Sequence, residues 1–207
     1  MKDDYSSYID NFFRKWAPLY DLVDLLIWKL RERVFHFVNP EKGAKILDLC
    51  TGTGKQAFAF GKRGFDVMGI DLSEDMLRIA KRKNGYKNVE FIVADASNLP
   101  SKENYFDICC ISFGLHEMPS SVREKVLQEM TRVTKPQGKI VIIDYAPPQD
   151  KIRNFLFYHL VSLYESRYFS EFIKTDLRDL FKKVRLNLKE SCYLFLGHVK
   201  ISKCEKV

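Results

Sequence analysis

The chain has 207 residues, of which 46% are hydrophobic, 14% aromatic and 29% charged. This hydrophobic content is enough to form a buried core, and the composition excludes disordered, collagen-like and low-complexity proteins. The net charge is +7, and residues 150–207 carry most of it, with 12 basic and seven acidic side chains. This bias is too diffuse for the concentrated basic stripe that nucleic acids bind, so we expect no nucleic-acid partner.

The cysteines and the N-terminal region indicate a cellular compartment. The five cysteines are odd in number and show no metal-binding spacing, so we expect reduced thiols, no metal site and a cytoplasmic protein. The first 13 residues are acidic and lack the apolar core of a signal peptide. Six charges within residues 19–38 exclude a membrane-spanning helix but leave peripheral membrane contact open.

Helical patterns come first along the chain. Residues 5–16 and 18–38 are predicted to be helical, and Asn39-Pro40 is predicted to end the second helix. From residue 44 onward, apolar runs typical of buried strands alternate with helical segments. The predicted strands are residues 45–50, 66–71, 89–95, 106–113 and 139–145. This alternation favours a parallel sheet that is covered on both faces.

Two helix starts carry capping signals. Ser73 is predicted to cap a helix with acidic residues in its first turn and basic residues in its last, which suits the helix dipole. Ser121 and Glu124 have the spacing of a capping box for a helix that runs to about Val133.

The C-terminal region departs from the alternation. Residues 150–183 are predicted to be helical and aromatic-rich, and two β-rich runs then meet at Gly197 as a hairpin on the sheet edge. We therefore expect one α/β domain over residues 1–207. Its parts would be a helical arm (1–40), a cofactor-binding core (41–149), a helical lid (150–183) and the hairpin (184–207).

A glycine turn follows the first predicted strand. Residues 52–57 fit the pattern G-x-G-x-x-A, in which backbone amides face an anionic part of a ligand. Gln56 after Lys55 excludes a phosphate-binding loop of the Walker type. Asp71, at the end of the next strand, suits two ribose hydroxyls and would repel a 2′-phosphate. NAD and S-adenosylmethionine both fit so far, and Asp48 favours the latter because its carboxylate can accept hydrogen bonds from an amino group.

Five ordered motifs resemble those of class I S-adenosylmethionine-dependent methyltransferases: ILDLCTGTG, GIDLSEDML, VADASNLP, FDICCISFGLHEM and VTKPQGKIVIIDY. The resemblance covers about residues 40–205. It implies a Rossmann-like, doubly wound, seven-stranded sheet whose last strand is antiparallel, with S-adenosylmethionine as cofactor. The cofactor-binding residues that it implies are Asp48, Cys50, Thr51, Gly52, Thr53, Gly54, Asp71, Leu72, Met76, Asp95, Ala96 and Ser112. Leu72 and Met76 fit a core role equally well.

Two further segments bear on the methyl acceptor. ISFGLHEM resembles a segment of the ubiquinone/menaquinone biosynthesis C-methyltransferases, and WAPLYDLVD resembles both that group and bacterial phospholipid N-methyltransferases. The chain departs from the quinone group in three places. His116-Glu117 replaces Arg-Asn, Lys55 replaces an acidic residue, and KPQG replaces KPGG. We therefore expect a small-molecule or lipid-like acceptor and keep ethanolamine headgroup methylation as an alternative.

The catalytic candidates follow from the chemistry of methyl transfer. A general base is needed only where the nucleophile loses a proton, and His116 suits this role by its ordinary pKa, with Glu117 orienting it or replacing it. Tyr20 is a candidate to contact the sulfonium by a cation–π interaction. A protein that binds S-adenosylmethionine without transferring its methyl group is the alternative of another class. The sequence does not indicate the oligomeric state.

Overall fold

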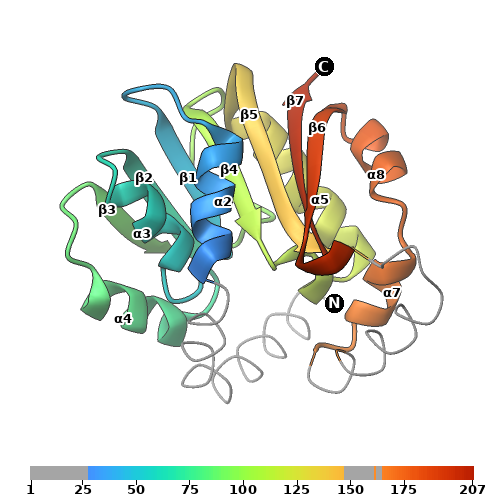
Figure 1. Cartoon of the computed structure of the whole chain (residues 1–207), viewed down its shortest axis with the longest axis horizontal. Helices are drawn as coiled ribbons and strands as arrows, with labels where there is room; N and C mark the ends of the chain where they lie inside the picture. The colour runs from blue at the N-terminus through green and yellow to red at the C-terminus, as the bar shows by residue number, and fades with distance from the viewer. Residues whose placement is uncertain (1–27, 147–160, 162–164) are drawn as a thin grey trace.

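The computed structural model describes residues 28–146, 161 and 165–207 as a sheet with helices on both faces (Figure 1). Tyr20, most of the predicted arm and much of the predicted lid lie outside the described residues. No helix in the described part of the chain is long and apolar enough to cross a membrane.

The sheet has seven strands in the order β3-β2-β1-β4-β5-β7-β6. Strands β1 to β5 are parallel to one another, whereas β7 runs antiparallel to both β5 and β6. This arrangement confirms the expected Rossmann-like sheet with an antiparallel last strand. The strands are β1 (Lys45–Leu49), β2 (Asp66–Asp71), β3 (Val89–Val93), β4 (Phe106–Ser112), β5 (Thr134–Tyr145), β6 (Leu186–Leu194) and β7 (Val199–Lys206).

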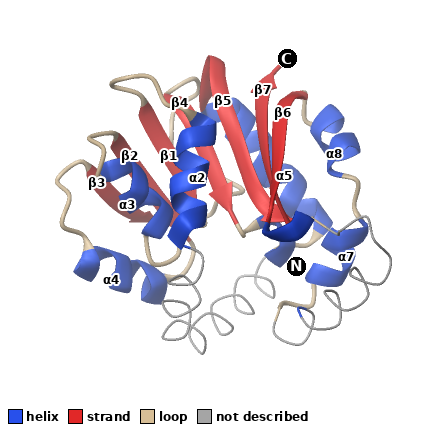
Figure 2. Cartoon of the chain, viewed as in Figure 1, coloured by secondary structure: helices blue, strands red, loops and turns tan. Residues whose placement is uncertain are grey.

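Helices cover both faces of the sheet (Figure 2). The described helices are α2 (Trp28–Val38), α3 (Lys55–Gly61), α4 (Glu74–Lys83), α5 (Ser120–Val133), α7 (Phe169–Lys174) and α8 (Leu177–Lys183), with 3-10 turns η1 (Leu115–Glu117) and η2 (Phe195–Gly197). In the view of Figure 1, α2 and α3 lie in front of the sheet and α5 lies behind it. Each face buries its own apolar cluster. Cys110 belongs to one cluster and Cys109 to the other, as alternation along a strand requires.

The two predicted helix caps have different outcomes. The Ser73 hydroxyl accepts a hydrogen bond from the Met76 amide at 3.4 Å, and the predicted charge pattern of α4 is present. The predicted capping box of α5 is wrong. The helix begins at Ser120 after Pro119, which makes no side-chain capping bond, so Ser121 already lies in the first turn. Glu124 instead pairs with Lys183 of α8 at 2.6 Å.

β5 begins five residues earlier than the sequence predicts. The segment KPQG is typical of a turn, yet Thr134 pairs with Phe106 across an irregular register at the start of the strand. Gln137 adopts a φ of 65° there. This left-handed conformation is usually taken by glycine, which the KPGG pattern would provide at this position.

Candidate active site

The predicted site residues gather where the strand order reverses. β1 pairs with β2 on one side and with β4 on the other, so the loops after these strands leave in different directions. In open α/β sheets, ligands bind outside the carboxyl ends of the strands at such a switch point. Here the ends of β1, β2, β4 and β5 carry the residues considered below (Figure 1).

Asp48 is buried in β1, and one of its carboxylate oxygens has no hydrogen-bond partner among the described residues. Its Oδ2 accepts a hydrogen bond from the Thr51 hydroxyl at 2.6 Å. Its Oδ1 is buried and has no hydrogen-bond partner among the described residues. Burial raises the pKa of Asp48 to about 6, against the lowering effects of Thr51 and the Arg31 charge. A buried acceptor of this kind favours a cationic donor, since a positive charge would stabilise the carboxylate.

Asp71 holds the glycine turn in place. Its Oδ2 accepts from the Gly52 amide at 2.8 Å and its Oδ1 from the Ser73 amide at 2.9 Å. Burial raises the pKa of Asp71, and these backbone hydrogen bonds oppose the rise. The turn residues Thr51 and Thr53 are buried as well. Asp71 therefore links the turn to the end of β2, a structural role that sequence reasoning missed, and each oxygen keeps a further lone pair for a ligand.

Gly54 ends the turn and begins α3. It has a φ of 84°, and a Cβ at this position would lie 2.7 Å from a ring carbon of Phe91. Both the left-handed backbone and the aromatic neighbour therefore require glycine.

The residues expected to surround an adenosine follow β2 and β3. Leu72 is half-buried, whereas Met76 is only 3% exposed and its side chain belongs to the protein interior. Asp95 and Ala96 are half-buried after β3, and Asp95 Oδ1 accepts from the Ser97 amide at 2.8 Å. These four positions thus lie along the same edge of the sheet, beyond β2 and β3.

Cys50 and Ser112 lie between two groups of residues. The first, called the cofactor half below, contains Asp48, Asp71 and the glycine turn, and the second, called the acceptor half, is the cluster around His116. Cys50 has a φ of 52°, a left-handed backbone conformation that glycine adopts more readily than other residues. Burial and the charges of Asp71 and Asp48 raise the pKa of the Cys50 thiol, which therefore stays protonated. The Ser112 hydroxyl, at the end of β4, is buried and has no hydrogen-bond partner in the described part of the chain.

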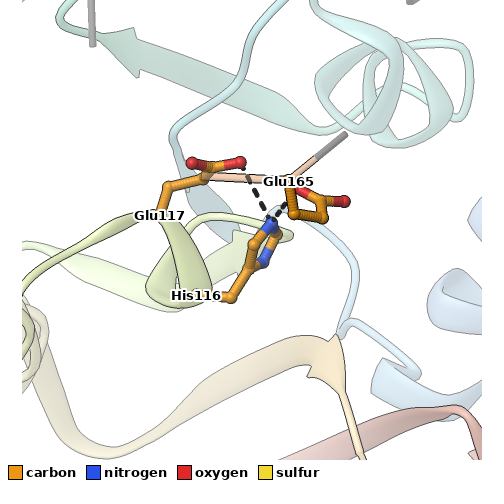
Figure 3. A group of neighbouring side chains, drawn as sticks. All are labelled: His116, Glu117 and Glu165. Atoms are coloured by element: carbon orange, nitrogen blue, oxygen red, sulfur yellow. Dashed lines mark hydrogen bonds and ion pairs between the residues drawn. The ribbon is translucent and has the colours of Figure 1, made fainter. Parts of the chain in front are cut away.

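His116 is the centre of a buried cluster of carboxylates. Its Nδ1 lies 2.7 Å from Asp144 Oδ1, and its Nε2 lies 3.2 Å from Glu117 Oε1 and 3.1 Å from Glu165 Oε2. Figure 3 shows both glutamate carboxylates facing the same imidazole nitrogen. The Tyr145 hydroxyl donates to Glu165 Oε1 at 2.7 Å. Glu117 Oε1 thus pairs with the imidazole, whereas its Oε2 is buried without a hydrogen-bond partner among the described residues.

Aromatic rings surround His116. The ring centroid of Tyr145 lies 4.8 Å away, and those of Phe169 and Phe172 each lie 6.2 Å away. Phe169 and Phe172 are buried, at 1% and 2% exposure, and pack inward. The cluster therefore lies in a medium of low polarity, where charges interact strongly.

The cluster changes the expected chemistry of His116. Burial works to lower the pKa of His116, but Asp144 and Glu165 outweigh it and raise that pKa well above its usual range. Burial raises the pKa of Glu117, and His116 only partly offsets this. Burial also works to raise the pKa of Glu165, but the His116 charge and the hydrogen bonds to His116, Glu117 and Tyr145 together outweigh it, so the net shift is downward. Sequence reasoning assumed an ordinary histidine pKa, whereas this imidazole holds its proton firmly.

Three members of the cluster were missed by sequence reasoning. Asp144 and Tyr145 end an apolar strand, and a charge at the carboxyl end of such a strand is a usable signal. Glu165 lies in the predicted lid, 49 residues from His116, and no local pattern distinguishes it.

Comparisons with known proteins identify the family of the chain. The model of the ubiE/COQ5 methyltransferase family matches residues 1–171. The chain belongs to this family. The description of this family agrees with the expected enzyme class, a methyltransferase.

Curated relatives support the family assignment, and solved structures share the fold. A demethylmenaquinone methyltransferase from Paenarthrobacter aurescens is 38% identical over 145 residues, which cover 68% of this chain and 56% of that protein. The chain spans less than two thirds of the length of this and the next relatives. The methyltransferase in a Haloferax volcanii complex with the activator Trm112 has the same fold, with a TM-score of 0.77, 17% identity and coverage of 95% and 96%. A SAM-dependent methyltransferase from Aquifex aeolicus has a TM-score of 0.67, 22% identity and coverage of 86% and 89%.

Proposed function

We propose that the protein methylates a ring carbon of a hydroxylated aromatic acceptor of the quinone-precursor type. The family and the name of its 38% identical relative support this class of acceptor. The observation that carries the chemistry is the Glu117 carboxylate, which is buried beside His116 among aromatic rings, with Oε1 3.2 Å from His116 Nε2 and with Oε2 lacking a hydrogen-bond partner in the described residues.

The cofactor half of the site would bind the polar groups of S-adenosylmethionine. Asp48 Oδ1 is a buried acceptor that fits the ammonium group, and the turn amides fit the carboxylate. Asp71 would accept the ribose hydroxyls through its remaining lone pairs. Bound S-adenosylmethionine supplies an electrophilic methyl group on a good leaving group. The remaining contacts in this proposal are Cys50, Thr51, Gly52, Thr53 and Gly54 at the methionine end, Leu72, Met76, Asp95 and Ala96 at the adenosine, and Ser112 between them.

The acceptor half would prepare the nucleophile. In this proposal a Glu117 oxygen accepts the proton of a ring hydroxyl, and the released electron pair makes a ring carbon nucleophilic. That carbon then bonds to the methyl group in line with the leaving sulfur, and its own hydrogen leaves as a proton. His116 would position Glu117 rather than act as the base, since Asp144 and Glu165 keep its proton in place.

Two further features belong to the proposal. Tyr20, outside the described residues, would face the sulfonium as a cation–π partner. An acceptor with an apolar tail would also bring the protein to a membrane surface, where its positive net charge favours anionic lipids.

The test uses purified protein, S-adenosylmethionine and a reduced prenylated naphthoquinone with deuterium at its free ring carbon. We expect a product with one added methyl group and no deuterium, because C-methylation replaces the ring hydrogen. Retained deuterium would indicate methylation of oxygen and contradict the proposal. Phosphatidylethanolamine vesicles in a parallel reaction test the headgroup alternative. Cofactor binding without transfer to either acceptor would favour a non-catalytic protein.

A further inference from the structure

Among the described residues, the buried cluster around His116 contains three carboxylates and one imidazole. Glu117, Asp144 and Glu165 surround a single imidazole, and the side chains of all four residues are at most 7% exposed. The buried Arg123 guanidinium donates to the Leu115 and Met118 carbonyls at the two ends of η1. Buried charges are costly unless they are paired or bind a metal.

The ligand atoms already have the spacing of a metal site. His116 Nε2, a Glu117 oxygen and a Glu165 oxygen all lie within 4.8 Å of one another. The two separations from Nε2 are 3.2 Å to Glu117 and 3.1 Å to Glu165. An ion at about 2.0–2.2 Å from each ligand holds neighbouring ligand atoms about 3–3.5 Å apart. An ion therefore fits among these atoms with small side-chain adjustments (Figure 3).

The surrounding hydrogen bonds orient these ligands. A histidine ligand commonly donates its other ring N–H to a carboxylate, which fixes the tautomer and the ring orientation. Asp144 does this at Nδ1, and its second oxygen accepts from the Leu115 and His116 amides at 3.0 and 3.3 Å. The Tyr145 hydroxyl holds Glu165 in the same way.

We propose that His116, Glu117 and Glu165 bind a divalent transition-metal ion, for which zinc is a suitable probe. One imidazole nitrogen with two carboxylate oxygens suits zinc and its neighbours better than Mg²⁺ or Ca²⁺, which prefer oxygen ligands alone. On binding, the ion replaces the proton on Nε2, and the proton leaves to solvent. Three protein ligands leave a coordination position open. The sequence predicted no metal site because its cysteines lack metal-binding spacing, and Glu165 is 49 residues from His116 along the chain.

The site would have a consequence for catalysis. An acceptor hydroxyl at the open position would lose its proton more readily, because a bound cation lowers the pKa of an oxygen ligand. That consequence rests on the proposed function. The metal site itself does not, and it is tested without cofactor or acceptor.

The experiment is a titration of metal-free protein with zinc, followed by equilibrium dialysis and elemental analysis. We expect one zinc per chain, and at least a tenfold loss of affinity in Glu117→Gln and in Glu165→Gln. Asp144→Asn should lose 10- to 100-fold, as for other residues that orient a metal ligand. Glu90→Gln, at an exposed position of β3, is the matched control and should bind as the wild type does.

Two further measurements separate this site from other causes. Circular dichroism and the thermal midpoint of each metal-free variant show whether it folds, and zinc should raise the midpoint of the wild type and of the control. Cobalt in place of zinc should give ligand-field absorption without thiolate charge transfer, since no cysteine is a ligand. A thiolate band, wild-type zinc affinity in both glutamine variants, or no zinc binding by the wild type would overturn the proposal. The cluster would then be a proton-bridged ion-pair cluster. Methyl transfer by a protein that binds no metal would leave the proposed function intact.

Discussion

The two halves of the candidate site are built differently. The cofactor half comes from short motifs, in which Asp48 contacts Thr51 three residues away and Asp71, at the end of β2, accepts from Gly52 in the turn after the adjacent strand β1. The acceptor half joins His116 to Asp144 and Glu165, which are 28 and 49 residues away. Local motifs thus form the proposed cofactor half, whereas the proposed acceptor half depends on long-range packing, so we expect that the two halves can change independently.

The largest expected effect separates the two halves most sharply. Glu117→Gln keeps the size of the side chain but removes the proton acceptor, and loss of general-base catalysis costs about 10²–10⁴-fold in kcat. The affinity for S-adenosylmethionine should stay unchanged, which calorimetry of the same preparation measures. A parallel loss of cofactor affinity would show that the halves are coupled, and Glu90→Gln again serves as the control.

Asp48→Asn tests how much folding stability the protein loses by keeping a buried, ionised carboxylate in the cofactor half. A carboxyl whose folded pKa of about 6 exceeds its unfolded value of 3.8 binds its proton more tightly in the fold. The wild type therefore loses stability as pH rises from about 4 to 6, by about 3 kcal/mol from about two pKa units. The neutral variant should lack this loss and be more stable at pH 7, yet bind the cofactor more weakly. The charges of Arg31 and Asp71 also act on this carboxyl.

Urea unfolding at several pH values checks the Asp48 prediction. The difference in unfolding free energy between wild type and variant should grow from pH 4 to pH 6 and then level off. A difference that does not vary with pH would contradict the raised pKa.

Asp71→Ala tests the ribose assignment. Charge-assisted hydrogen bonds contribute about 1.5–3 kcal/mol, so the affinity for S-adenosylmethionine should fall by about 10- to 150-fold. Asp66→Ala, at the exposed start of the same strand, should bind normally. Unchanged affinity in Asp71→Ala would refute the assignment, and a chemical-shift comparison of the turn amides shows whether the turn is displaced.

Ser112→Ala should have the smallest effect and probes the boundary between the halves. The buried hydroxyl has no hydrogen-bond partner in the described part of the chain, so its removal should leave the unfolding free energy of the ligand-free protein nearly unchanged. If the hydroxyl contacts the cofactor, the affinity should fall by about 2- to 10-fold, as expected for one neutral hydrogen bond. An equal change in acceptor KM would instead place Ser112 in the acceptor half.

The sequence predicted the fold because its signals are local. Apolar runs of strand length, the turn from Gly52 to Gly54 and the Ser73 cap each act within a few residues, and the structure contains all of them. The α5 cap was mistaken because Pro119 starts the helix ahead of the capping box. The early start of β5 was missed because pairing with β4 overrides a turn-like sequence.

The sequence by itself determined the alternation of strands and helices, the glycine turn and its flanking carboxylates, since these depend on side-chain periodicity and backbone conformation. Only the tertiary structure decided the protonation and partners of those groups. Asp48 acquires its raised pKa by burial, and Glu165 reaches His116 only when the segment before α7 packs against η1. Desolvation and charge pairing depend on distances in space, which no local pattern in the sequence specifies.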